Sequence, residues 1–419
     1  MIIQNALVAC LLLLSSIVSA QSDVRAEGKK IVDTLTSPTM SGRGYNGGDQ
    51  LAAQYILNRF AQSNLDTVRQ PFPININTFP GNVSVRVGKK QLTTGKSFIV
   101  ASHSQAARET YKLKRINFSK AYDSTNNRLN VKGKSNQWLW YQKEQMPEKL
   151  KKQWRNVVEE GKAFGANGLV EVTTGNLTMS MSQEVKPFTQ IIVRDSAWNK
   201  KAKKITVDIE QKYLPTYVTQ NVIGIKKGTL YPDSFIMVTA HYDHLGRLGR
   251  DVYFPGANDN ASGTAMMILL ADSIAKQPLK YTSVFIGFSG EEAGLVGSEY
   301  FTQQPLIALA NIKYLVNLDM NGTGEEGIKV VNGAVDTIAF NKLKLLNKQN
   351  GMLLTSVQPR GKAANSDHYY FSEAGVPAFF IYTLGGVSFY HDVYDRPETL
   401  DMPEFNDLHQ LLLLFLRSF

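Results

Sequence analysis

Hydrophobic and polar positions change their period along the chain, and the clearest pattern lies beyond residue 216. Short apolar runs typical of buried strands alternate there with stretches whose apolar residues recur at helical spacing. The predicted strands cover 222–225, 234–240, 283–288, 312–318, 329–332 and 378–382. The predicted helices cover 261–275, 298–303, 336–349, 368–374 and 402–416. Because strands that alternate with helices form βαβ units, this part predicts an α/β fold with a mixed, mostly parallel sheet flanked by helices.

The N-terminal part follows two other patterns. Residues 27–69 are predicted to be helical, with Asp49 as a cap of the helix in DQLAAQYILNRF, and residues 71–82, rich in Pro, Asn and Phe, predict a connector. One amphipathic helix is predicted over 147–163. Short strand-like runs cover 83–87, 97–101, 137–141, 168–172, 189–193 and 205–209. A β-rich stretch between helical segments, in a chain of 419 residues, predicts an inserted β-rich domain.

The inserted stretch is also basic and rich in tryptophan. Residues 21–220 carry a net charge of +15 and residues 221–419 carry −5. A basic half can favour nucleic acid or an anionic surface. Its lysines are dispersed and no nucleic-acid motif accompanies them, so we expect a solvated basic module without a nucleic-acid partner. Trp138, Trp140 and Trp154 can form a carbohydrate or peptide platform, but their large apolar surface favours a place in the core.

The first twenty residues form a separate segment. The run LVACLLLLSSIVSA ends in Val18-Ser19-Ala20, which predicts a secretory signal peptide cleaved before Gln21 and export to the periplasm or the medium. A membrane anchor is the alternative, but the run is short for a bilayer and two serines interrupt it. Cys10 is the only cysteine. The mature chain would therefore have no disulfides, and its metal ligands would have to be His, Asp or Glu.

Polar residues with metal-binding chemistry follow the apolar runs of the second half. They lie in TAHYDHLG, PGANDNASG, FSGEEAGLVGS, NLDMNG and YHDVYDRPETL. The candidate ligands are His241, Asp259, Glu292, Asp319 and His391. Because the carboxyl ends of parallel strands form the binding crevice of such a sheet, we expect these side chains to meet there. Ligands of these types suit zinc, with cobalt or manganese also tolerated.

The chemistry of these side chains suggests a role for each. Asp259 can bridge two cations, with His241 and Asp319 on one and Glu292 and His391 on the other. Asp243 lies two positions after His241 and can orient its imidazole. Asp392 or Asp395 can do the same for His391. Glu291 remains for proton transfer, taking a proton from the attacking water and giving it to the leaving amine.

Each of these residues also has a plainer interpretation. An isolated His-x-Asp is usually a surface turn, and Asp or Asn before a helix is usually a cap. Adjacent acids after a strand are common on protein surfaces. The recurrence of such residues after successive apolar runs favours the metal site. His368, at the start of a predicted helix, is expected to be structural or to support the ligands.

Six segments together resemble the M28 family of zinc aminopeptidases: AHYDHLG, GANDNASG, SGEEAGLVGS, NLDMNG, SDHYYFSEAGVPA and YHDVYDRPETLD. The resemblance covers about 216–419, while Asp49–Phe60 resembles the family's N-terminal helix. The stretch containing GKAFGANGLV is similar to the protease-associated domain inserted in many relatives. After the predicted signal peptide of 1–20, the resemblance implies a catalytic domain of 21–84 and 216–419 around an insert of 85–215. It also implies the same five ligands, with Glu291 as general base and Asp243 as support.

The sequence departs from the family at one position. Some relatives have a tyrosine three residues before the Ser-Asp-His segment, where it helps to hold the oxyanion. Ala363 stands there in this chain. Tyr369, Tyr370 and Tyr382 are the candidate substitutes.

These features predict an exported di-zinc aminopeptidase that hydrolyses N-terminal peptide bonds with metal-activated water. Its partners would be peptides with a free N-terminus. One alternative is a glutaminyl cyclase-like enzyme, which resembles the same fold but works with one zinc. Another is a non-catalytic binding module, although such relatives typically lose ligands that this chain retains.

Overall fold

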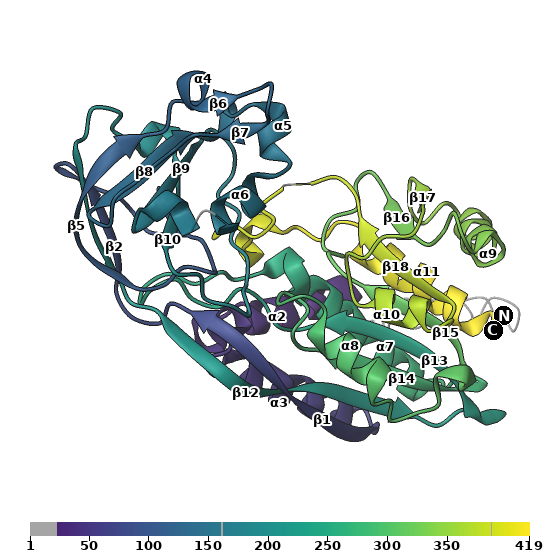
Figure 1. The fold of residues 1–419 in the computed structure, drawn as a ribbon. Helices are drawn as coiled ribbons and strands as arrows, with labels where there is room; N and C mark the ends of the chain where they lie inside the picture. Colours follow the sequence, from purple (N-terminus) through teal and green to yellow (C-terminus); the bar gives the residue numbers. More distant parts are fainter. Residues whose placement is uncertain (1–22, 161, 387) are drawn as a thin grey trace, which may run out of the picture.

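The computed structural model describes residues 23–160, 162–386 and 388–419 (Figure 1). The predicted signal peptide, with its cleavage before Gln21, lies outside these residues. Within the described part, no helix has the length and apolarity needed to cross a membrane.

The first of two large sheets has eight strands in the order β1-β12-β14-β13-β15-β18-β16-β17. The bounds in that order are Asp66–Thr78, Lys212–Lys226, Tyr281–Phe288, Tyr231–His241, Ile312–Leu318, Ala378–Thr383, Ile328–Val331 and Val357–Arg360. The central strands β14, β13, β15 and β18 run parallel, whereas β1, β12 and β16 pair antiparallel with their inner neighbours. The predicted mixed sheet flanked by helices is therefore confirmed.

Helices cover both faces of this sheet. One core packs the sheet against α2 (Val24–Leu35), α3 (Gly48–Gln62), α7 (Gly263–Lys276), α9 (Thr337–Gln349) and α11 (Phe405–Arg417). The core on the opposite face includes Phe301 of α8 (Val296–Gln303) and Phe371 of α10 (His368–Glu373). The sheet is thus buried on both sides, which explains why its central strands are near-continuous apolar runs.

A second eight-stranded sheet is built from the basic stretch, in the order β3-β2-β11-β5-β8-β9-β10-β4. Its bounds in that order are Lys90–Gln91, Val83–Val87, Lys204–Ile209, Ala107–Arg115, Gln137–Gln142, Gly168–Thr173, Thr189–Arg194 and Phe98–Val100. Figure 1 shows it as the blue and teal part, reached from the first sheet by the long strands β1 and β12. Trp138, Trp140 and Trp154 are all buried, as expected for core residues.

Short elements complete both parts. They are α4 (Phe118–Ala121), α5 (Glu148–Lys151), α6 (Trp154–Glu160), β6 (Tyr122–Asp123) and β7 (Arg128–Leu129). The 3-10 turns are η1 (Pro38–Arg43), η2 (Lys143–Gln145), η3 (Lys162–Gly165), η4 (Asp195–Ala197), η6 (Leu309–Asn311) and η7 (Pro397–Thr399), and η5 (Ala257–Ser262) is a π-turn.

Three predictions about the N-terminal half are wrong. Residues 71–82 are mostly strand, because Phe72, Ile74 and Ile76 alternate with exposed positions and an edge strand tolerates proline. The helix over 147–163 is broken into α5 and α6, and the backbone at Ala163 is left-handed. Asp49 does not cap α3, since Gly47 holds the cap position and Asp49 is buried in the first turn.

Candidate metal centre

The candidate ligands meet at the carboxyl ends of the parallel strands. His241 is the last residue of β13, Glu292 follows β14, and Asp319 follows β15. His391 lies in the loop after β18, and Asp259 lies in η5 before α7. All five are buried or nearly so. The sheet therefore brings together residues that are spread over 150 positions of sequence.

Each carboxylate oxygen of Asp259 faces a different pair of ligands. Its Oδ1 lies 3.4 Å from His241 Nε2, and the same nitrogen lies 3.4 Å from Asp319 Oδ1. Its Oδ2 lies 3.2 Å from His391 Nε2, which in turn is 3.0 Å from Glu292 Oε2. The five side chains thus form two three-residue sets that share Asp259.

The loop that carries Asp259 is held by buried side chains. Arg43, fully buried, donates through Nη2 to the carbonyl oxygens of Gly256 and Asp259 at 2.9 and 3.1 Å. The carboxylate of Asp395 accepts hydrogen bonds from the backbone N–H groups of Asn258 and Asp259 at 2.8 and 3.0 Å. Asp259 is therefore fixed from both sides.

The predicted supports for the histidines are only partly in place. His241 Nδ1 lies 3.3 Å from the carbonyl oxygen of Asp243 and 3.7 Å from its carboxylate. His391 Nδ1 instead lies 2.8 Å from the carbonyl oxygen of Met179, so its orientation by Asp392 or Asp395 is wrong. The reason is the path of the chain, because the segment between β9 and β10 of the second sheet places the Met179 carbonyl against this nitrogen.

Asp243 instead holds the segment of the two glutamates. Its carboxylate accepts the backbone N–H groups of Glu291 and Glu292, each at 3.3 Å, and the hydroxyl of Tyr45 at 2.8 Å. Glu291 Oε2 lies 3.9 Å from His241 Nε2. Burial raises the pKa of Glu291 well above its usual value; His241 opposes this, and Asp319 and Glu292 add to it.

Two residues near the centre were missed by the sequence interpretation. His244 is fully buried, and its Nδ1 lies 2.5 Å from Glu292 Oε1, which leaves Oε2 for His391. The Tyr390 ring stacks on the His391 ring with centroids 3.8 Å apart. Both residues lie within the motifs HYDH and YHDVYD. Their position in the sequence was therefore the one feature that could have indicated a place near the site. Tyr382 instead accepts a hydrogen bond from Arg360.

His368 lies outside the two ligand sets. Its ring packs against Phe380 with centroids 5.3 Å apart, and burial lowers its pKa to about 4. It therefore stays neutral near pH 7 and packs against β18, as expected for a structural residue.

The site has the features of a cation site. Asp259 Oδ2 and Asp319 Oδ1 are buried, and neither has a hydrogen-bond donor among the described residues. The donor atoms of His241, Asp259 and Asp319 lie within 4.8 Å of one another, as do those of His244, Asp259 and Glu292. Buried carboxylates are unfavourable without a compensating charge or hydrogen bond. A nitrogen and oxygen ligand set of this kind fits zinc.

The residues and the fold together define a metallopeptidase-like α/β protein, and sequence comparison relates its second half to a known family. The model of Peptidase family M28 matches residues 221–416. Aminopeptidase YwaD of Bacillus subtilis is 31% identical over 178 residues, which are 40% of this chain and 36% of that protein. A probable zinc metalloprotease of Pyrenophora teres is 36% identical over 124 residues, 29% of this chain and 26% of that protein. Residues 221–416 thus match peptidase family M28, and the matched segments span little more than a third of these relatives or less.

Solved structures extend the similarity of fold beyond the matched segment. BSAP, a zinc aminopeptidase from Bacillus subtilis, has a TM-score of 0.72 at 20% identity, covering 94% of each chain. A peptidase M28 precursor from Shewanella amazonensis has a TM-score of 0.73 at 15% identity, covering 93% of this chain and 92% of that one. At these identities the likeness concerns the fold, including the second sheet.

Proposed function

We propose that the protein is an exported di-zinc aminopeptidase that removes N-terminal residues from peptides. The main support for this proposal is the position of Asp259, a buried carboxylate whose two oxygens face two separate ligand sets. One set is His241 with Asp319, and the other is Glu292 with His391. When bound, two zinc ions would polarise the scissile carbonyl group and acidify the attacking water.

Glu291 is the proton carrier in this proposal. Its backbone is fixed by Asp243, and its Oε2 points towards His241. It accepts a proton from the attacking water and delivers it to the departing amine, so that hydrolysis leaves the residue unchanged. A carboxyl group whose pKa is raised above its usual value suits such transfer in both directions.

Tyr390 is our candidate for the oxyanion donor that the sequence left unassigned. Its ring is held against His391, and partial burial, together with the carboxylates of Asp259, Glu292 and Glu291, raises its pKa. The phenol therefore stays protonated and can donate a hydrogen bond to the developing oxyanion.

Substitution of the proposed base tests the function directly. Glu291→Gln should lower kcat on aminoacyl-p-nitroanilides by about 10²–10⁴-fold, the range expected for loss of a general base. Zinc content, measured by atomic emission, should stay near two per chain, because Glu291 belongs to neither ligand set. Glu299→Gln on α8 is the matched control and should keep full activity. Wild-type-like turnover by Glu291→Gln would exclude it as the base.

A further inference from the structure

His244 is a buried histidine beside the candidate metal centre that belongs to neither proposed ligand set. Its Nδ1 lies 2.5 Å from Glu292 Oε1, whereas Glu292 Oε2 lies 3.0 Å from His391 Nε2. Because an ionised carboxylate only accepts hydrogen bonds, Nδ1 is the donor in this contact. Such a charge-assisted bond is stronger than one between neutral groups. One oxygen of Glu292 is therefore bound to His244, and the other faces the ligand set.

The imidazole ring of His244 is held in place by its surroundings. Its ring lies edge-on to that of His391, with centroids 5.9 Å apart, and its backbone N–H donates to the carbonyl oxygen of Arg43 at 3.4 Å. A Cβ atom added at Gly256 would lie only 2.4 Å from His244 Cδ2, so the ring packs directly on that backbone. Its Nε2 is buried and has no hydrogen-bond partner in the described part of the chain. The polar interaction of this side chain is therefore the one with Glu292.

The other proposed ligand set has a comparable arrangement at Asp319. The hydroxyl of Ser366 donates to Asp319 Oδ2 at 2.9 Å. Asp319 Oδ1 lies 3.4 Å from His241 Nε2 and has no hydrogen-bond donor among the residues that the structure describes. In each set, a group outside the set holds one carboxylate oxygen and leaves the other for a cation. A carboxylate held in this way offers one oxygen as a ligand and leaves other coordination positions open.

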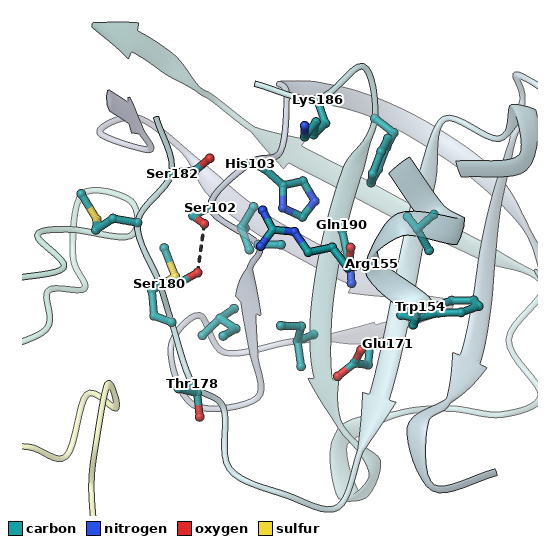
Figure 2. A pocket seen from close by; sticks show the side chains of 18 of the residues that line it. Ser102, His103, Trp154, Arg155, Glu171, Thr178, Ser180, Ser182, Lys186 and Gln190 are labelled. Carbon is teal, nitrogen blue, oxygen red and sulfur yellow. Dashed lines mark hydrogen bonds between the residues drawn. The ribbon is translucent and has the colours of Figure 1, made fainter. Parts of the chain in front are cut away.

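His391, the other non-bridging member of the set with Glu292, is held by different groups. Its Nδ1 lies 2.8 Å from the carbonyl oxygen of Met179, whose N–H donates to the His391 carbonyl oxygen at 3.1 Å. The next residue, Ser180, has its hydroxyl oxygen 3.0 Å from that of Ser102, just after β4 (Figure 2). Loss of the His244 imidazole should therefore act mainly through Glu292.

We propose that His244 is a positioning residue that holds Glu292 as a one-oxygen ligand of the cation shared by Asp259, Glu292 and His391. The inference rests on the proposed two-zinc function and adds a residue to it. Without the imidazole, the carboxylate of Glu292 would lose its fixed orientation, and ordering it again on binding would cost affinity. Groups that orient metal ligands typically contribute roughly 10–100-fold to metal affinity.

Zinc titrations of two variants test this role. In His244→Ala, one of the two zinc equivalents should bind roughly 10–100-fold more weakly, measured by competition with a chromophoric chelator. The other equivalent should bind as in the wild type, which also shows that the fold and the set around His241 are intact. His244→Asn keeps an N–H donor near the position of Nδ1 and should restore most of the lost affinity.

Further variants make the result interpretable. His409→Ala is the matched control, because it removes a buried histidine of α11 that bonds to Ser273 at 3.2 Å and belongs to neither set. It should leave both zinc affinities unchanged. If the space left by alanine at position 244 destabilises the fold, His244→Leu fills it without a donor and should show the same weakened zinc.

Two outcomes would overturn the inference. One is wild-type zinc affinity in the variants that lack the donor. The other is an equal loss of affinity in His244→Asn and His244→Ala, which would mean that His244 is itself a ligand or acts only through packing.

The inference and the proposed function fail in different ways. If the wild type cleaves no peptide or p-nitroanilide, the aminopeptidase function fails, and the zinc titrations still decide the role of His244. If the wild type is active and His244→Ala binds zinc as the wild type does, only the role of His244 fails.

Discussion

Asp49 is a buried carboxylate outside the two ligand sets, in the first turn of α3. It accepts hydrogen bonds from the hydroxyls of Tyr217 and Thr219 at 2.8 and 2.9 Å. Burial outweighs these bonds and raises its pKa from 3.8 to about 6. The folded protein thus binds this proton more tightly than the unfolded chain does. The contribution of Asp49 to stability is therefore fully present below about pH 4 and is lost as the pH rises through about 6.

Asp49→Asn should remove this part of the pH dependence. The asparagine oxygen can still accept from Tyr217 and Thr219, but it does not ionise. Urea unfolding should show the wild type losing up to about 3 kcal/mol relative to the variant between pH 4 and pH 7. The exposed Asp66→Asn is the matched control and should follow the wild type. Parallel pH curves for wild type and Asp49→Asn would refute the assignment.

The proposed role of the Tyr390 hydroxyl as oxyanion donor can be tested by a single substitution. Tyr390→Phe removes the hydroxyl and keeps the ring that stacks on His391. If the hydroxyl holds the oxyanion, kcat should fall about 10²-fold with KM nearly unchanged. Tyr394→Phe, in the same loop, is the control and should have little effect. A wild-type kcat for Tyr390→Phe would show that the oxyanion is held elsewhere.

The five proposed ligands could be predicted because each stands at or soon after an apolar run. A polar or charged side chain buried there is unfavourable unless it has a partner, such as a metal ion. The support of His391 could not be predicted. Met179 is 212 positions away in sequence and contacts His391 through its backbone carbonyl. Such a contact does not depend on the residue type, so the sequence does not reveal it. The contact of His244 with Glu292 could not be predicted either, because the two residues are 48 positions apart in sequence.

Strand β1 shows why whole elements differ in how well a sequence predicts them. The central strands β13, β14 and β15 are buried on both faces and read as apolar runs. By contrast, β1 lies at the edge of its sheet, and Pro71 and Pro73 stand at its exposed positions. Strand β5 was missed for a similar reason, because most of its residues are exposed and many are charged.

The two prolines of β1 should also protect its open edge. Proline has no backbone N–H, so it weakens pairing with the edge of another sheet. We expect Pro71→Val with Pro73→Val to increase self-association, seen as a larger mass by light scattering at high protein concentration. Thr67→Val, also exposed on β1, is the control for added apolar surface. An unchanged mass for the double variant would mean that the edge is protected by other means.

The candidate metal centre connects distant parts of the molecule. Its proposed ligands lie at or after the ends of β13, β14, β15 and β18 and in η5, and Met179, in the segment between β9 and β10, contacts His391. Without cations, the carboxylates of Asp259, Glu292 and Asp319 repel one another in a buried site.

Chelation should therefore lower Tm by several degrees as well as abolish activity, because a ligand that binds only the folded state stabilises it. Titration of the chelated protein with zinc should restore Tm and activity, with saturation at two equivalents. His391→Ala should reduce the bound zinc to about one. Saturation of the wild type at one equivalent would contradict the paired sets around Asp259 and favour a one-zinc enzyme of the cyclase kind.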